Sequence, residues 1–239
     1  MSLHSVSDTP SSIKVLQQQN LLWSANRAPA QQVLNSTGFS DLDEKLQGGF
    51  PTHGVVEIAS EAGIGELRLL MPYLKQESEE RLCVLINPPA DVNGHAFLEQ
   101  GINYNNIVII EEQDFNAALW AAEQSLKSGC CGAVLLWQQE LEIHQAKRLQ
   151  VASEHGKCLQ FVMKKPQANA LSLPISLSLA LSPDQEGIRV SITKRKGGFS
   201  RSSFVVSMGQ YWPRLTSQVI EAQSAQIVAF PAPHKRYAH

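Results

Sequence analysis

The sequence has little of what disulfide-stabilised, metal-binding or membrane-spanning proteins depend on. It holds four cysteines in 239 residues, and no two of them form a Cys-x-x-Cys pair. It contains no His-Glu-x-x-His motif and no Cys/His cluster, so we expect no metal ion. No apolar run approaches the roughly 18 residues of a membrane span, and the first twelve residues lack the apolar stretch of a signal peptide. We therefore expect a cytoplasmic protein with unpaired thiols.

An excess of one charge is also missing. The formal net charge is -2, from 20 basic and 22 acidic residues. Without a basic excess, any contact with nucleic acid has to come from a local patch. Apolar residues make up 43% and charged residues 18% of the chain, which is typical of an ordered globular protein.

Composition divides the chain into three parts. Residues 1–35 are polar and mixed, and we expect a short helix and a linker there. Residues 36–215 carry regular apolar segments and are predicted to form one core. Residues 216–239 hold two prolines and a basic His-Lys-Arg stretch without periodicity, which predicts a flexible tail.

Apolar strands and helices alternate through the predicted core. Asp114 is predicted to cap one helix and Gly129 to end it, and Gly156 is predicted to end the next. Trp120 and Trp137 are interpreted as core aromatics. The expected strands are residues 54–59, 81–86, 106–110, 132–137 and 158–163, and the expected helices include residues 91–100 and 140–155.

Fully apolar strands separated by helices are typical of βαβ units, with a parallel sheet that is buried on both faces. From residue 172 the pattern changes to short alternating segments, which predict antiparallel strands at the sheet edge. The predicted fold class is therefore α/β, with a central mainly parallel sheet and antiparallel edge strands.

A glycine-rich turn follows the first of these strands, in the stretch IASEAGIGELRLL (58–70). A phosphate-binding loop has the form Gly-x-x-x-x-Gly-Lys-Ser/Thr, in which backbone N–H groups and the lysine hold phosphate and the hydroxyl binds Mg²⁺. Here Glu66 stands where the lysine belongs, so the sign of the charge is reversed, and Leu67 offers the metal no oxygen. On the following helix, Glu66 and Arg68 are expected to stay outside the core. The degenerate nucleotide site comprises Ser60, Glu61, Gly63, Gly65, Glu66 and Leu67.

Longer stretches resemble known families. STGFSDLDEKLQGGFPTHGVVEI (36–58) resembles the start of the RecA-type ATPase core, and the resemblance continues to about residue 208. It implies a RecA-like three-layer αβα fold. GIGELRLLMP (63–72) and AKRLQVASEHGKCLQFVMKKP (146–166) resemble the ImuA proteins more narrowly. ImuA proteins are RecA-like accessory proteins of damage-induced translesion synthesis, related to the SulA cell-division inhibitors of the SOS response.

The resemblance also implies that this chain is not an ATPase. Where RecA-type enzymes place their catalytic glutamate, this sequence has Pro89, and where they place the Walker B aspartate it has Trp137. Together with Glu66 and Leu67, these positions predict a chain without enzymatic activity and without a nucleotide cofactor. A true ATPase with unusual loops is the least favoured of the alternatives.

A late basic segment, TKRKGG (193–198), resembles the RecA edge strand whose lysines reach the nucleotide of a neighbouring subunit. Here its lysines either face Glu61 and Glu66 of a neighbour or belong to a solvated hairpin. The basic side chains near it either form a rim that binds DNA weakly and without sequence preference, or are ordinary surface charge. The set for DNA or partner binding comprises Lys164, Lys165, Lys194, Arg195, Lys196 and Arg201.

A further apolar group stands in the polar N-terminal part. Leu21, Leu22 and Trp23 either anchor a neighbouring subunit, giving a homo-oligomer, or fold back onto the chain's own core.

Two functions follow from the resemblance. The first is a non-catalytic adaptor in SOS-induced DNA damage tolerance, which acts in translesion synthesis with RecA and an ImuB-like Y-family polymerase homologue. The second is a SulA-like SOS cell-division inhibitor that binds the tubulin homologue FtsZ. The front segment STGFSDLDEKLQGG (36–49) favours the first function, because SulA-type chains are shorter there.

Overall fold

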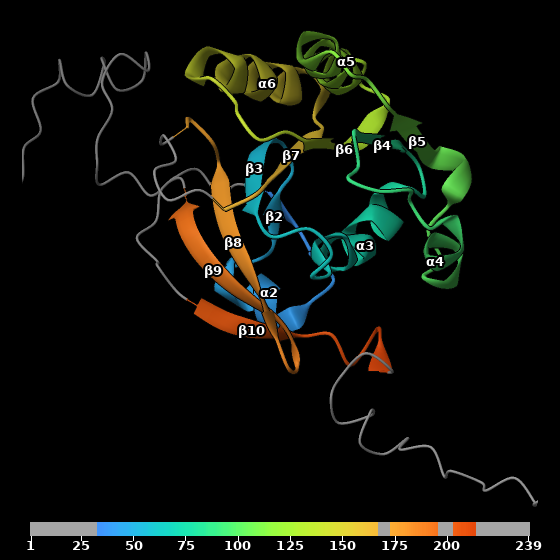
Figure 1. Cartoon of the computed structure of the whole chain (residues 1–239), viewed down its shortest axis with the longest axis vertical. Helices are drawn as coiled ribbons and strands as arrows, with labels where there is room; N and C mark the ends of the chain where they lie inside the picture. Colours follow the sequence, from blue (N-terminus) through green and yellow to red (C-terminus); the bar gives the residue numbers. More distant parts are fainter. Residues whose placement is uncertain (1–32, 167–172, 196–202, 214–239) are drawn as a thin grey trace, which may run out of the picture.

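The computed structural model describes residues 33–166, 173–195 and 203–213. An eight-stranded sheet runs through it in the order β10-β9-β8-β3-β7-β6-β4-β5 (Figure 1). The six strands from β8 to β5 are parallel, and β9 and β10 join β8 in antiparallel fashion at one edge. The strands are β3 (Gly54–Ala59), β4 (Leu82–Ile86), β5 (Ile107–Ile110), β6 (Cys131–Trp137), β7 (Leu159–Lys164), β8 (Leu177–Asp184), β9 (Gly187–Arg195) and β10 (Ser203–Ser207). The predicted α/β class with antiparallel edge strands is confirmed.

Helices cover both faces of the parallel part, so the molecule has three layers there (Figure 1). One face carries α2 (Ser40–Lys45), α3 (Glu66–Glu77) and α4 (Gly94–Glu99), and the other carries α5 (Phe115–Lys127) and α6 (Ile143–Gly156). A short ribbon of β1 (Leu34–Asn35) and β2 (Phe50–Pro51) precedes β3, and a 3-10 turn, η1 (Tyr104–Asn106), precedes β5.

Each central strand contributes to two cores because its side chains alternate between the faces. In β3, Val56 and Ile58 pack in the core under α2, α3 and α4, whereas Val55 packs in the core under α5 and α6. Both cores are apolar, which is why the strands appear in the sequence as continuous apolar runs. Within the described residues, no helix is long and apolar enough to cross a membrane.

The helix ends test the sequence predictions closely. The Asp114 side chain accepts a hydrogen bond from the N–H of Ala117 at 3.0 Å, and Gly129 has a left-handed φ of 73°, as predicted for the start and end of α5. The predicted helix over residues 91–100 is shorter, because Asn93 caps α4 with hydrogen bonds to the N–H groups of His95 and Ala96.

The predicted end of α6 at Gly156 is wrong by one residue. Gly156 is the last helical residue, and Lys157 takes the left-handed conformation at φ 49°. A Cβ at position 156 would run into the carbonyl oxygen of Leu126 near the end of α5. Gly156 therefore allows a close helix contact rather than a helix stop. The Arg81 guanidinium then donates to the carbonyl oxygens of Lys157 and Gly156, at 2.8 and 3.0 Å.

The N-terminal part of the described core packs along α3. Gly38 has a φ of 87°, and a Cβ there would collide with Pro72 in the middle of α3. The hydroxyl of Tyr211, near the other end of the described chain, donates to the Gly38 carbonyl oxygen at 2.8 Å. Of the two tryptophans interpreted as core aromatics, Trp137 is partly buried against the α3-side core, but Trp120 is 62% exposed, so that prediction is wrong.

Candidate functional site

The glycine-rich turn connects the end of β3 to the start of α3, where a phosphate-binding loop belongs in an α/β fold. Ser60 is buried and its N–H donates to the carbonyl oxygen of Lys164 at 2.9 Å. Gly63 and Gly65 have φ values of 85° and 105°, a backbone conformation that residues other than glycine rarely adopt. The two glycines therefore permit the tight reversal that the sequence predicted.

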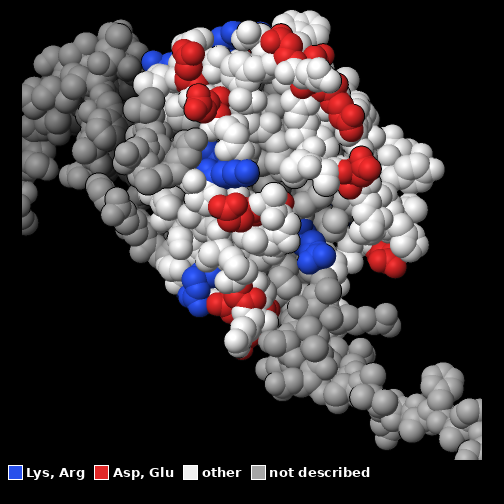
Figure 2. Space-filling model, in the orientation of Figure 1, with Lys and Arg blue, Asp and Glu red and all other residues white. Residues whose placement is uncertain are grey.

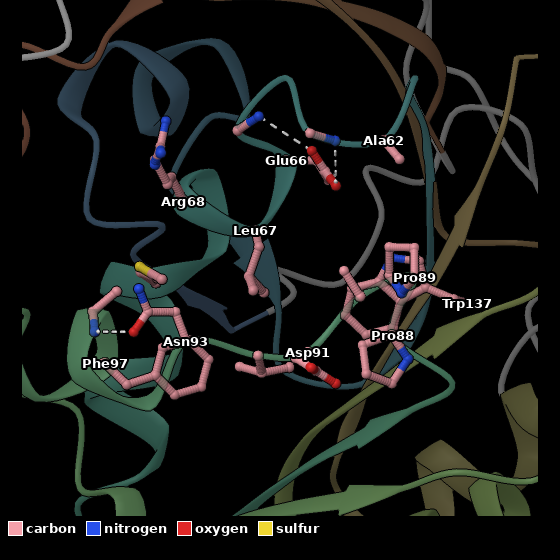
Figure 3. A pocket seen from close by; sticks show the side chains of 16 residues that line it. Ala62, Glu66, Leu67, Arg68, Pro88, Pro89, Asp91, Asn93, Phe97 and Trp137 are labelled. Carbon is pink, nitrogen blue, oxygen red and sulfur yellow. Dashed lines mark hydrogen bonds between the residues drawn. The ribbon is translucent and has the colours of Figure 1, made fainter.

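The carboxylate of Glu66 fills this turn. Its Oε1 accepts from the N–H of Gly63 at 3.2 Å, and its Oε2 accepts from the N–H of Gly65 at 3.1 Å (Figure 3). In a phosphate-binding loop such N–H groups hold the anion. Here the first residue of α3 supplies its own anion, in the position that the helix dipole favours.

The expectation that Glu66 stays outside the core is therefore wrong, because the residue is only 7% exposed. The unpaired N–H groups at a helix N-terminus require an acceptor, and the Glu66 carboxylate accepts from those of Gly63 and Gly65. Arg68, two residues later, is exposed as expected.

A cavity of about 490 Å³ opens beside the filled turn, bounded by the start of α3, the loop between β4 and α4, and the end of β6 (Figure 3). Its polar lining includes Glu66, Arg68, Asp91 and Asn93. Most of the other side chains are apolar, among them Leu67, Met71, Pro88, Pro89, Phe97 and Trp137.

Three residues that the sequence predicts to replace ATPase residues meet around this cavity. Leu67, Pro89 and Trp137 are far apart in the sequence, and all three line it. None of these side chains can accept a proton from water or coordinate a metal ion. Within residues 33–166, 173–195 and 203–213, no group of three or more His, Cys, Asp or Glu side chains could hold a metal ion.

Lys164, the first of the predicted binding cations, is held inside the molecule. Its Nζ lies 2.7 Å from Oε2 of Glu57, and the two side chains are 8% and 10% exposed. Ser178 Oγ donates to the other carboxylate oxygen of Glu57 at 2.9 Å. Lys164 therefore neutralises a buried carboxylate of β3, while Lys165 beside it is exposed.

The basic end of β9 also turns back onto the protein. The Lys194 ammonium donates to the carbonyl oxygen of Leu173. Arg195 Nη2 donates to the carbonyl oxygen of Leu46 at 2.9 Å, at the end of α2. Lys196 and Arg201 lie outside the described residues, so a basic rim that binds DNA or a partner stays a prediction. Of the two lysines at the end of β7, Lys165 is the one that is exposed to solvent.

Two further predictions concern contacts between subunits. The Glu66 carboxylate, suggested as an acceptor for a neighbour's lysine, already accepts two N–H groups of its own turn, whereas Glu61 is exposed. The apolar group of Leu21, Leu22 and Trp23 lies outside the described residues, and its role in self-association stays a prediction.

Sequence reasoning missed the pair of Glu57 and Lys164, although a signal was present. Glu57 stands inside the apolar strand GVVEIA (54–59), which the sequence predicts to be buried on both faces. A carboxylate in such a strand needs a cationic partner. Lys164 ends the neighbouring parallel strand, and β3 and β7 pair with Ala59 beside Lys164.

The comparisons with known proteins point to one group. No protein-family model matches the sequence. The cell division inhibitor SulA of Pseudomonas aeruginosa is 28% identical over 149 residues, which cover 58% of this chain and 85% of that protein. The SulA of Photorhabdus laumondii is 28% identical over 98 residues, 41% of this chain and 55% of that protein. The crystal structure of the Pseudomonas aeruginosa SulA matches 46% of this chain and 98% of its own, with 28% identity and a TM-score of 0.40. The sequence is thus distantly similar to two SulA proteins.

Proposed function

We propose that this chain is a non-catalytic protein of the bacterial SOS response that acts by binding other proteins. The observation that carries the proposal is the Glu66 carboxylate on the N–H groups of Gly63 and Gly65. A triphosphate entering the turn would have to displace this carboxylate and would meet its negative charge. The apolar side chains of Leu67, Pro89 and Trp137 around the adjacent cavity support the same conclusion.

Nucleotide binding tests this part of the proposal directly. We expect millimolar ATP with Mg²⁺ to leave the thermal unfolding midpoint unchanged, because a ligand that does not bind the native state does not stabilise it. A rise in the midpoint with ATP, absent with Mg²⁺ alone, would restore the ATPase alternative.

The similarity to two SulA proteins favours cell-division inhibition as the specific role. In this form of the proposal the chain binds FtsZ and prevents its polymerisation. We expect the purified chain to lower the amount of FtsZ that sediments with GTP, and overexpression to give filamentous cells. Unchanged FtsZ sedimentation at a molar excess of the chain, together with normal cell length, would exclude this role.

The folded segment before β3 favours the translesion role as a second candidate. It carries the stretch STGFSDLDEKLQGG (36–49), on which the resemblance to ImuA over SulA depends. This segment is part of the core: Asn35 Nδ2 donates to Glu77 Oε1 at 3.1 Å, and Gly38 packs on Pro72.

In the translesion role the chain binds RecA and an ImuB-like Y-family polymerase homologue. We expect both to be retained by the immobilised chain from purified mixtures, while FtsZ passes through. Retention of FtsZ alone would assign the inhibitor role, and retention of none of the three proteins would contradict both. A gene for an ImuB-like protein beside the gene for this chain would add independent support.

A further inference from the structure

The cavity beside the filled turn has the size of a small-molecule binding site. Its volume of about 490 Å³ lies within the range of roughly 300–1,000 Å³ that is usual for ligand pockets. Its walls come from three separate segments, namely the start of α3, the loop between β4 and α4, and the end of β6. The proposed role in binding other proteins gives this cavity no ligand of its own.

The walls of the cavity are suited to a flat apolar group. Phe97 is buried, and Leu67 and Trp137 pack partly buried against the α3-side core, so the apolar surface is held in place from below. Figure 3 shows Leu67 on one side of the space and Pro89 and Trp137 on the other. Aromatic rings stack well on flat side chains of this kind. A ligand with an aromatic ring would therefore fill the space between these walls.

Two carboxylates lie at opposite ends of the same space. In Figure 3 the carboxylate of Glu66 stands above the gap between Leu67 and Pro89, and that of Asp91 stands below it. Each oxygen of Glu66 accepts one N–H of the turn, and a carboxylate oxygen can accept a second hydrogen bond. Asp91 is exposed and has no hydrogen bond or ion pair with any residue that the structure describes. Both carboxylates can therefore still accept from a ligand.

The other polar side chains of the lining leave this negative charge in place. Asn93 is uncharged, and Arg68 is the one cation among the lining residues. In Figure 3 the Arg68 guanidinium points away from the space between Leu67 and Pro89. In Figure 2 the side of the molecule where α4 lies in Figure 1 shows acidic and uncharged surface without basic residues. The local charge thus favours a cation and opposes an anion.

We propose that this cavity binds a small aromatic amine. The ring lies between Leu67 on one side and Pro89 and Trp137 on the other, and the ammonium group donates to the carboxylates of Glu66 and Asp91. The face of Trp137 adds to the attraction for a cation nearby. A nucleotide or an aromatic acid would bring negative charge to the same two carboxylates, so neither belongs to the ligand class of this cavity.

Three probes that share an indole ring test the ligand class. Tryptamine carries an ammonium group at neutral pH, tryptophol carries a neutral hydroxyl, and indole-3-acetate carries a carboxylate. Titration of the full wild-type chain by ligand-observed NMR measures the three affinities. We expect tryptamine to bind most tightly, tryptophol severalfold more weakly and indole-3-acetate most weakly. Added salt should reduce the advantage of tryptamine over tryptophol, because salt screens the attraction between charges.

Asp91→Asn tests the charge contact at an exposed side chain, where the change should leave the fold intact. It should weaken tryptamine binding severalfold and leave tryptophol binding unchanged, because the ring contacts remain. Glu79→Gln is the matched control, at an exposed glutamate that does not line the cavity, and should change neither affinity. Arg68→Gln should not weaken tryptamine binding.

Ala96→Phe tests the location of the ring. Ala96 lies in α4 and lines the cavity, so a phenyl group there should fill the space and abolish binding of both tryptamine and tryptophol. The thermal unfolding midpoint without ligand shows whether this variant is folded. If it is not folded, the comparison of Asp91→Asn with Glu79→Gln decides alone.

Three results would overturn the proposal. The first is a wild-type chain that shows no tryptamine binding up to about 10 mM, weaker than the few kcal/mol of a millimolar ligand. The second is indole-3-acetate binding as tightly as tryptamine, which would move the charge contact to Arg68. The third is tryptamine binding that Asp91→Asn leaves unchanged, or that a folded Ala96→Phe leaves unchanged, which would place the bound amine elsewhere on the molecule.

Discussion

At the scale of single residues, two carboxylates near the turn after β3 determine what this region can do. Glu66 satisfies the N–H groups of the turn, and Glu57 is neutralised by Lys164 beneath it. Both carboxylates are therefore already paired within the chain. Because these residues also stabilise the fold, the first effect expected from substituting them is a change in the free energy of unfolding.

Lys164→Ala should lower the free energy of unfolding by about 3–5 kcal/mol, because it leaves the Glu57 carboxylate buried without its cation. Urea denaturation followed by circular dichroism measures this. Lys165→Ala is the matched control, since the neighbouring lysine is exposed and its loss should change stability by less than about 0.5 kcal/mol. Equal effects of the two changes would mean that the buried pair does not form.

The double variant Glu66→Lys with Leu67→Thr restores the two phosphate-loop residues but should not hydrolyse ATP. Pro89 and Trp137 still line the cavity, and the resemblance to RecA-type enzymes places the catalytic base and the metal-binding aspartate at these two positions. Phosphate release above the level of the wild-type chain would show that these two positions have been misidentified. The variant should also be less stable, because Gly63 and Gly65 lose the acceptor for their N–H groups.

At the scale of elements, the strands could be predicted from the sequence better than the helix ends. The strands are continuous apolar runs because both sheet faces are covered, and this pattern is local. The role of Gly156 was not visible, because its contact with Leu126 joins residues of two different helices. The exposure of Trp120 was also not predicted, because helical spacing alone does not say which side of α5 the sheet covers.

The candidate site could be predicted in part. Glu66 and Leu67 follow from the phosphate-loop spacing, which is local, whereas Pro89 and Trp137 follow only from the resemblance to RecA-type enzymes. Their meeting around one cavity follows from strand order. The position of the Glu66 side chain depends on the exact turn geometry, and the partners of Lys164, Lys194 and Arg195 depend on tertiary contacts. Residue spacing predicts neither the position of the Glu66 side chain nor the partners of these basic residues.

The contact between α5 and α6 gives a prediction for pH. Glu123 is 7% exposed, accepts from Lys127 Nζ at 2.6 Å and pairs with Arg148. The hydrogen bond from Lys127 is the largest cause that lowers the pKa of Glu123 below its ordinary value of 4.5. A carboxyl group with a lowered pKa stabilises the folded state above its unfolded pKa, and this contribution is lost as pH falls through the folded pKa.

Glu123→Gln should therefore be less stable than the wild-type chain at neutral pH, and the difference should shrink as the solution is acidified below about pH 4.5. Urea denaturation of both proteins across this range measures it. Glu79→Gln, at an exposed glutamate after α3, should show little difference at any of these pH values. A stability difference for Glu123→Gln that stays constant with pH would assign its effect to packing instead of charge.

At the scale of the whole molecule, the filled turn lies at the carboxyl end of β3, near the middle of the eight-stranded sheet. Within the described residues, the two apolar cores draw their buried side chains from between Phe39 and Met208.

A fragment of residues 33–213 should therefore fold by itself. Since the fragment keeps both cores, its thermal midpoint should lie within about 4 °C of that of the full chain at equal molar concentration, a difference of less than about 1 kcal/mol. Differential scanning calorimetry measures this midpoint. A fragment that unfolds at much lower temperature would show that residues 1–32 or 214–239 contribute to the core.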